Sequence, residues 1–176
     1  MKDQCFYHLD HFPLFTKFYL DEAKRAYYPP WERHIYASRI ESSKDNSFER
    51  SSFLRQLKKD FPKTTASYHR FKPGTLYDFH TDQPDDLGNR KKCSINIVLS
   101  EEIGTTLFHL DWINTATRQV VPCDYVRFRP TLFNAEIPHC VLNASSETRY
   151  LMMLSFYEID FANLKPYLDA VKIDHY

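Results

Sequence analysis

The sequence predicts a mainly β domain with flanking helices, folded as a double-stranded β-helix (jelly roll). Three observations predict this class. From Thr64 onward the apolar residues recur with a period of two, the spacing of a strand with one buried face. Turn signals separate many short apolar runs, as in sandwiches and barrels. Aromatic residues make up 16% of the chain, and β-branched runs are frequent in its second half.

Residues 64–157 form the expected β core. Its expected strands are Thr64–Phe71, Leu76–Asp82, Ser94–Ser100, Thr105–Trp112, Arg118–Val121, Tyr125–Phe128, Pro138–Leu142 and Arg149–Tyr157. The segment Lys72–Thr75 should turn the first strand back into the second, because its Pro-Gly pair suits a type II turn. The three glycines, Gly74, Gly88 and Gly104, all fall in expected loops.

Helices are expected on both sides of this core, in residues 1–63 and 158–176. Asn46 or Ser47 can cap a helix whose apolar residues recur at helical spacing until Phe61-Pro62. The tail, Asp160–Lys172, should be helical with an interruption at Pro166. No repeat or linker divides the chain, so we expect a single domain over residues 1–176.

The composition restricts the class of partner. Lys plus Arg equals Asp plus Glu at 23 each, so the chain lacks the basic excess of a nucleic-acid binder. No stretch approaches the roughly 20 apolar residues of a membrane span. The cysteines share no short zinc or disulfide spacing; they are Cys5, Cys93, Cys123 and Cys140. We therefore expect reduced thiols in a cytoplasmic protein, with no nucleic-acid or membrane partner.

A metal site is suggested by the pattern His-x-Asp. Alternate residues of a strand project from the same face, so an imidazole nitrogen and a carboxylate oxygen can reach one ion. The pattern occurs three times, as His8/Asp10, His80/Asp82 and His109/Asp111. A single match is therefore weak evidence, and the position of each in the expected topology has to separate them.

The pair His80 and Asp82 fits best, with His139 as the third ligand. In a jelly roll the two ligand strands are neighbours in space but distant in sequence. Too few residues separate Asp111 from His139 for the strands that must intervene, and no strand precedes His8. Two histidines and one carboxylate form a facial triad that leaves the opposite coordination positions open, which is typical of non-haem Fe(II) oxygenases.

The segment from Pro138 to Tyr150 is more specific. It has the pattern of a strand, a polar turn and a strand, and a hairpin of this length should return Arg149 near His139. A guanidinium can bind a carboxylate through two parallel hydrogen bonds. The alternative for Arg149 is an ion pair with one of the 23 acidic residues of the chain.

These residues together resemble the 2-oxoglutarate/Fe(II)-dependent oxygenase superfamily. The stretch Phe71–Asp82 is similar to the prolyl-4-hydroxylase-like branch, in which a glycine six residues and a Tyr three residues before the metal His recur, as Gly74 and Tyr77 do. The resemblance covers roughly residues 64–157. It implies Fe(II), 2-oxoglutarate and O2 as cofactors, His80, Asp82 and His139 as metal ligands, and Arg149 on the distal carboxylate of 2-oxoglutarate. It further implies a hydroxylase that releases succinate and CO2, because related halogenases lack the carboxylate ligand.

The chain departs from that branch where a Tyr often binds the cosubstrate, since Phe71 stands there. Tyr68, Ser94 or Asn96 could supply the missing hydrogen bond. Tyr77 and Phe79 are candidates for the substrate pocket or for the core. Beyond the polar loop at 83–89, Arg90 and Lys91 could meet an anionic substrate, although a solvated loop is the favoured interpretation.

Four functions remain open. The leading one is a hydroxylase of a small molecule, an amino acid or a peptide side chain. The others are a non-catalytic jelly-roll binding module, a cupin-like Fe enzyme that does not use 2-oxoglutarate, and a nucleic-acid dealkylating oxygenase. Arg149 would be unnecessary in the cupin-like enzyme, and the zero net charge disfavours the dealkylating one.

Overall fold

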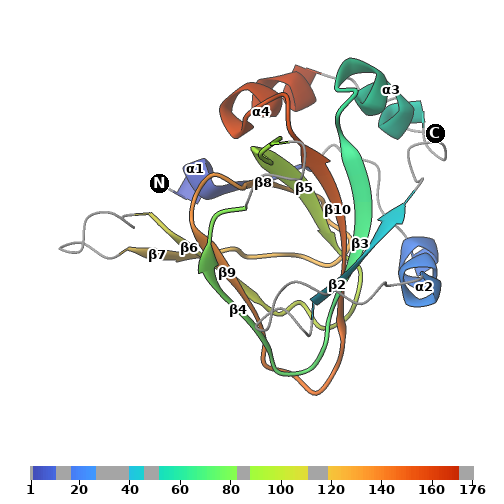
Figure 1. The fold of residues 1–176 in the computed structure, drawn as a ribbon, viewed down its shortest axis with the longest axis vertical. Helices are drawn as coiled ribbons and strands as arrows, with labels where there is room; N and C mark the ends of the chain where they lie inside the picture. Colours follow the sequence, from blue (N-terminus) through green and yellow to red (C-terminus); the bar gives the residue numbers. More distant parts are fainter. Residues whose placement is uncertain are drawn as a thin grey trace.

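Two antiparallel sheets face each other in a jelly roll (Figure 1). The computed structural model describes residues 2–10, 17–26, 40–45, 52–82, 88–110 and 119–170. The larger sheet has the strand order β1-β8-β5-β10-β3-β2, and the smaller one the order β4-β9-β6-β7. The strands are β1 Phe6–His8, β2 Ile40–Asp45, β3 Thr65–Phe71, β4 Thr75–His80, β5 Cys93–Val98, β6 Thr105–His109, β7 Val120–Pro122, β8 Thr131–Asn134, β9 His139–Asn143 and β10 Arg149–Phe156. The predicted fold class is confirmed.

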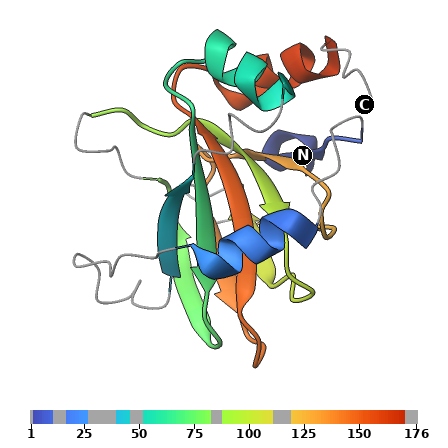
Figure 2. The ribbon, with the colours of Figure 1, turned by 90° about the vertical axis from the view of Figure 1, so that its right-hand side faces the viewer.

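Helices cover the outer face of the larger sheet (Figure 2). They are α2 Lys17–Arg25, α3 Ser52–Asp60 and α4 Phe161–Ala170, whereas α1 Lys2–Cys5 leads into the edge strand β1 and places Cys5 in the cluster between the sheets. Buried side chains of α2, α3 and α4, such as Leu20, Leu57 and Leu164, share one apolar cluster with alternate residues of β3, β5 and β10. Both faces of β5 are buried, because helices cover one and the second sheet covers the other.

A second apolar cluster lies between the two sheets. Val98 and Leu151 reach it from the larger sheet, and Phe108 from the smaller one. The alternation of side chains along each strand therefore separates a helix-facing core from a sheet-facing core. Functional side chains on the inner face of the larger sheet meet those of the smaller sheet in this second layer.

Two of the expected elements differ from those observed. Tyr125–Phe128 is not a strand: Phe128 has a φ of +62°, which breaks a ladder, and the strand follows Pro130 as β8. Pro166 does not interrupt α4. Proline has no N–H to donate to the carbonyl of Ala162, but both residues lie on the exposed face of the helix. The expected cap residues Asn46 and Ser47 lie outside the described residues, as does the end of the expected strand at Trp112.

The two expected hairpins are instead crossings between the sheets. β3 belongs to the larger sheet and β4 to the smaller, and the same holds for β10 and β9. The type II geometry of the first crossing agrees with the prediction, since Gly74 has a φ of +69° and the Thr75 N–H donates to the Lys72 carbonyl at 3.1 Å. Sequence pattern finds a reversal of the chain, but the partner of each strand depends on the tertiary packing.

Asn143 joins the two crossings. This residue is fully buried, and its side-chain amide donates to the carbonyls of Phe71 at 2.8 Å, Lys72 at 3.3 Å and Glu147 at 2.8 Å. Its own carbonyl accepts from the Gly74 N–H at 2.8 Å. One side chain therefore satisfies backbone groups in both connections. Among the described residues, no helix is long and apolar enough to cross a membrane.

We expect Asn143→Ala to lower the free energy of unfolding by about 3 kcal/mol, because it leaves buried carbonyls without donors. Urea unfolding at neutral pH measures the change. The matched control is Ser146→Ala, an exposed position in the same connection, which should change stability by less than about 0.5 kcal/mol. Equal effects of the two substitutions would contradict the assigned role of Asn143.

Candidate metal and cosubstrate site

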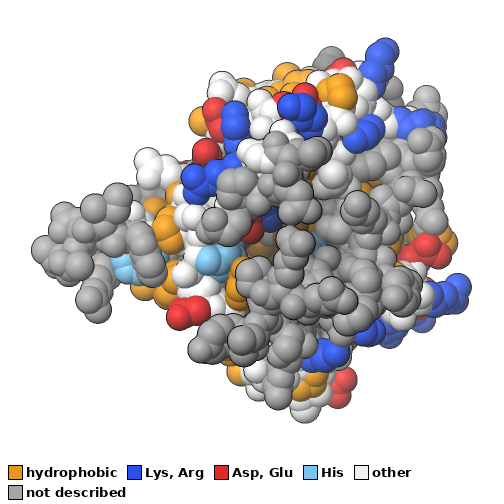
Figure 3. Space-filling view, viewed as in Figure 1, with side chains coloured by type: hydrophobic (Ala, Val, Ile, Leu, Met, Phe, Trp, Pro, Cys, Tyr) orange, Lys and Arg blue, Asp and Glu red, His pale blue; other side chains and the backbone are white. Residues whose placement is uncertain are grey.

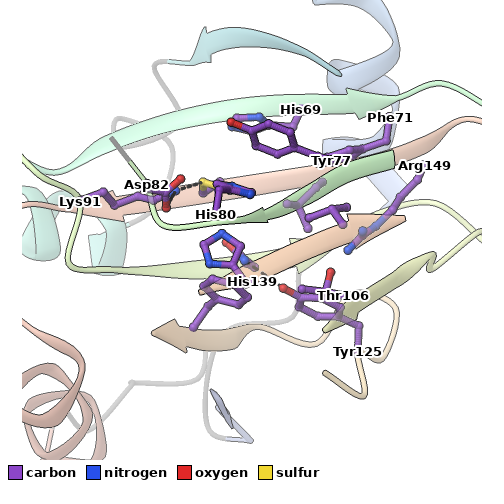
Figure 4. Close-up of a pocket in the computed structure, with 15 residues that line it drawn as sticks. His69, Phe71, Tyr77, His80, Asp82, Lys91, Thr106, Tyr125, His139 and Arg149 are labelled. Atoms are coloured by element: carbon purple, nitrogen blue, oxygen red, sulfur yellow. Dashed lines mark hydrogen bonds and ion pairs between the residues drawn. The ribbon is translucent and has the colours of Figure 1, made fainter. Parts of the chain in front are cut away.

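A cavity of about 120 Å³ opens between the two sheets. Histidine side chains reach the surface beside hydrophobic ones on the face shown in Figure 3. The polar side chains that line the cavity are His69, Tyr77, His80, Asp82, Lys91, Asn96, Thr106, Tyr125, His139 and Arg149. Figure 4 shows them in two groups, with Asp82, His80 and His139 toward one end and Arg149, Tyr125 and Thr106 toward the other.

The structure brings His80, Asp82 and His139 together. One possible ligand atom from each lies within 4.8 Å of the other two. His80 ends β4 and pairs in register with His139, the first residue of β9, so their ring centroids are 4.5 Å apart. Two imidazoles and one carboxylate at this spacing can hold one divalent transition-metal ion on one face.

A β-bulge in β4 sets the direction of these side chains. The register with β9 shifts between Tyr77 and His80, so both residues face the cavity although an odd number of positions separates them. Asp82 lies two residues beyond the end of β4, which corrects the expected strand end. The same shift turns Phe79 out of the cavity, where its ring meets that of His109 edge-on at 5.5 Å. Phe79 is therefore not a pocket residue.

Backbone carbonyls fix the tautomer of both histidines. His80 Nδ1 lies 2.6 Å from the Asp78 carbonyl, and His139 Nδ1 lies 2.9 Å from the Ile137 carbonyl. A carbonyl can only accept, so each Nδ1 carries the proton and each Nε2 keeps its lone pair for a metal. Metal-binding histidines are usually oriented in this way.

Burial keeps both imidazoles neutral. It lowers the pKa of His139 to about 4 and lowers that of His80 in the same direction. Burial opposes ionisation of Asp82, but the ammonium of Lys91, 2.7 Å from Oδ2, outweighs it and holds the pKa of the carboxyl below its usual value. At neutral pH the three residues therefore offer two lone pairs and one carboxylate, the protonation states that a metal requires.

The other two His-x-Asp pairs have different surroundings. His8 Nδ1 lies 3.0 Å from Thr131 Oγ1 in the β1–β8 pair, and Asp10 forms an ion pair with Arg129. The ring of His109 packs on Phe79, and Asp111 lies outside the described residues. Among the described residues, only the His80 pair meets a third ligand.

Arg149 is a buried cation at the inner end of the cavity. Its side chain is fully enclosed, with its guanidinium carbon 5.1 Å from the Phe71 ring and 5.2 Å from the Tyr125 ring. Nε and Nη1 make no hydrogen bond with any described residue, and no described carboxylate forms an ion pair with this side chain. The alternative of an internal ion pair is therefore not found in the described part of the chain. A buried guanidinium without an anion requires one.

Gly104 makes room for Arg149. Its φ is +65°, and a Cβ at this position would lie 2.9 Å from Arg149 Cδ, 3.0 Å from the Leu142 carbonyl and 3.2 Å from Arg149 Nη1. A side chain here would therefore displace the guanidinium. The sequence predicted a loop glycine, but the close approach to Arg149 could only be seen in three dimensions.

The three candidates for the cosubstrate hydrogen bond that Phe71 cannot make differ in where they lie relative to the cavity. Asn96 lines the cavity and its side-chain amide donates to the Tyr125 hydroxyl at 2.9 Å. Ser94 is buried on the same face of β5 but does not reach the cavity. Tyr68 is wrongly assigned: strand alternation places it on the opposite face of β3 from Phe71, in the core below the helices.

Sequence reasoning missed Tyr125, which contacts both Asn96 and Arg149. It follows β7 in a segment that was expected to be a strand, and no spacing motif marks it. The ring of His69 also lines the cavity, beside Phe71. Tyr77 also lines the cavity, with its ring centroid 3.8 Å from that of His80.

No protein-family model matches the chain, and no curated protein matches its sequence. Solved structures do match. A prolyl-4-hydroxylase from Pseudomonas putida superposes with a TM-score of 0.65 at 16% identity, over 89% of this chain and 94% of that one. The chain has the fold of the prolyl-4-hydroxylase-like 2-oxoglutarate oxygenases. The predicted resemblance is thus confirmed at the level of the fold.

Two further structures with this oxygenase fold carry relevant ligands. A prolyl hydroxylase from Trichoplax adhaerens, bound to a peptide of hypoxia inducible factor, matches with a TM-score of 0.59 at 14% identity, over 92% of this chain and 87% of that one. HygX from Streptomyces hygroscopicus, with nickel and 2-oxoglutarate bound, matches with a TM-score of 0.57 at 10% identity, over 88% and 84% of the two chains.

Two glycines offer a test of the packing around Arg149. Gly88→Ala and Gly104→Ala both place a side chain at a positive φ, +77° and +65°, and should each cost roughly 1–2 kcal/mol for that reason. Nothing lies within 4 Å of a Cβ at Gly88, so only Gly104→Ala should lose roughly a further 1–3 kcal/mol by overpacking. Denaturant unfolding of both variants measures the difference, and equal losses would refute the clash.

Proposed function

We propose that the protein is a 2-oxoglutarate- and Fe(II)-dependent dioxygenase that hydroxylates a small-molecule, amino-acid or peptidyl substrate and releases succinate and CO2. The observation that carries this proposal is the buried guanidinium of Arg149, which has no carboxylate partner among the described residues and lies in the same cavity as the three metal-ligand candidates. A dicarboxylic 2-oxo acid can chelate a metal at one end and bind a guanidinium at the other.

The residues fit both groups. His80 and His139 present Nε2 lone pairs, and Asp82 an oxygen, within one small volume. These three would hold Fe(II), which when bound supplies the activation of O2. Three protein ligands would leave room on the metal for the 2-oxo acid end of 2-oxoglutarate, while Arg149 would bind its other end. Asp82 favours hydroxylation, because it occupies the position that a halide would need.

The remaining lining residues orient the cosubstrate and exclude water. Arg149 would bind the distal carboxylate bidentately, between the faces of Phe71 and Tyr125. Thr106, which is buried in β6 and lines the cavity, and the hydroxyl of Tyr125 lie near the guanidinium end in Figure 4. We therefore assign the hydrogen bond missing at Phe71 to the Asn96–Tyr125 pair, whose hydroxyl can still donate after accepting from Asn96.

Two of the alternative functions are disfavoured by the same features. A cupin-like Fe enzyme that does not use 2-oxoglutarate has no need for a buried, unpaired Arg149. A binding module has no need for two tautomer-fixed histidines beside a carboxylate. A nucleic-acid partner is not expected from a chain of zero net charge. The cytoplasmic location stays a prediction.

The reaction is tested without knowledge of the substrate. Anaerobic protein with Fe(II) and 2-oxoglutarate should form succinate when O2 is admitted, because such enzymes decarboxylate 2-oxoglutarate slowly without substrate. Asp82→Asn should abolish succinate formation. It should also weaken Co(II) binding, measured by absorption spectroscopy, by more than the roughly 10- to 100-fold that is typical of a residue that only orients a ligand. The control is Asp10→Asn, the equivalent carboxylate of another His-x-Asp pair. The proposal is refuted if the wild-type protein forms no succinate and shows no metal-dependent binding of 2-oxoglutarate.

Arg149→Gln should weaken 2-oxoglutarate binding to the Co(II)-loaded protein by roughly 10- to 100-fold, since it removes a charge-assisted hydrogen bond pair. Calorimetric titration measures the affinity, and Co(II) affinity should stay as in the wild type. Arg127→Gln is the matched control, because Arg127 pairs with Glu101 outside the cavity. An unchanged 2-oxoglutarate affinity in Arg149→Gln would contradict the assigned role.

A further inference from the structure

We infer that the substrate carries a carboxylate group and that Lys91 binds it. This inference rests on the proposed function, because it uses the charges of the metal and the cosubstrate. The observation behind it is a second cation in the cavity, at the end opposite Arg149 (Figure 4).

The sequence favours a solvated loop at Lys91, but the structure places this residue in the wall of the cavity. It precedes β5, its side chain is only 14% exposed, and its ammonium lies 2.7 Å from Asp82 Oδ2 and 3.4 Å from Met153 Sδ. Its neighbour Arg90, by contrast, is exposed and does not line the cavity. One of the two cations therefore points into the site.

The other titratable lining residues carry no charge at neutral pH. Burial lowers the pKa of His69 to about 3, and His80 and His139 are neutral as metal ligands because each Nδ1 donates to a backbone carbonyl and leaves the Nε2 lone pair for the metal. Burial raises the pKa of Tyr77 and of Tyr125. The charged groups among the described lining residues are therefore one carboxylate and two cations.

The charges of the loaded site do not balance. Asp82 contributes −1, and Lys91 and Arg149 contribute +1 each. Fe(II) adds +2 and the dianion of 2-oxoglutarate adds −2, so the sum over the described residues and both ligands is +1. Without Lys91 the sum would be zero. Once the metal neutralises Asp82, no other described lining residue offers a negative charge to the ammonium of Lys91 in this mostly enclosed cavity, which favours the entry of an anion.

A monocarboxylate matches this excess. It carries −1, whereas a phosphate carries about −1.5 to −2 at neutral pH and would overcompensate. A zwitterionic amino acid would bring its own ammonium and leave the excess unchanged. Lys91 offers three donors, and the neutral ring of His69, whose Nε2 lies 2.8 Å from Ser67 Oγ, adds a polar but uncharged wall. Leu151 and Val141 line the cavity for the apolar part of the substrate.

The test compares matched acids and amides. Protein loaded with Co(II) and 2-oxoglutarate under anaerobic conditions is titrated with acetate, benzoate and hexanoate, and with acetamide, benzamide and hexanamide. The Co(II) absorption spectrum reports binding near the metal. We expect at least one acid to bind and its amide to bind roughly 10- to 100-fold more weakly. Lys91→Met should remove this preference, while Lys91→Arg retains part of it and Arg90→Met all of it.

The outcomes separate the two proposals. Failure of the wild type to bind 2-oxoglutarate in the presence of metal overturns the proposed function itself. If 2-oxoglutarate binds, the inference on Lys91 is overturned by any of three results. These are no binding of any acid at millimolar concentration, equal binding of acids and amides, or an acid preference that survives in Lys91→Met. A loss of 2-oxoglutarate affinity in Lys91→Met would also overturn it, because Lys91 would then hold the cosubstrate.

Discussion

The site depends on two places where the chain passes from one sheet to the other. The turn between β3 and β4 and the connection between β9 and β10 are tied together by the buried amide of Asn143, which donates to carbonyls in both. These crossings bring His80 and His139 from the smaller sheet to face Arg149 on the larger one. Had the strands formed ordinary hairpins, ligands and guanidinium would lie in a single sheet.

The charges along this cavity suit anionic ligands. Among the described residues that line it are two cations and one carboxylate. Arg149 Nε and Nη1 have no hydrogen-bond partner among them at one end, while Lys91 holds Asp82 at the other. Natural cores rarely keep a buried cation unpaired, because the desolvation cost is large. The arrangement is therefore more informative about function than the His-x-Asp pattern, which two other pairs in the chain share.

The local irregularities of the fold serve the same cavity. The bulge in β4 turns His80 inward and Phe79 outward, and the lack of a Cβ at Gly104 leaves space for Arg149. Neither follows from regular strand geometry. They are the kind of local exception that functional sites require of an otherwise alternating β-sheet.

The sequence alone predicted the fold class and selected His80, Asp82, His139 and Arg149 as candidates for the site, because strand period, motif spacing and side-chain chemistry are local properties. Only the tertiary structure decided which strands pair, that Tyr68 faces the helices, and that Tyr125 and Lys91 face the cavity. Those facts depend on contacts between residues far apart in the chain. A side chain's face follows from its own strand, but what it meets there is set by the opposite sheet.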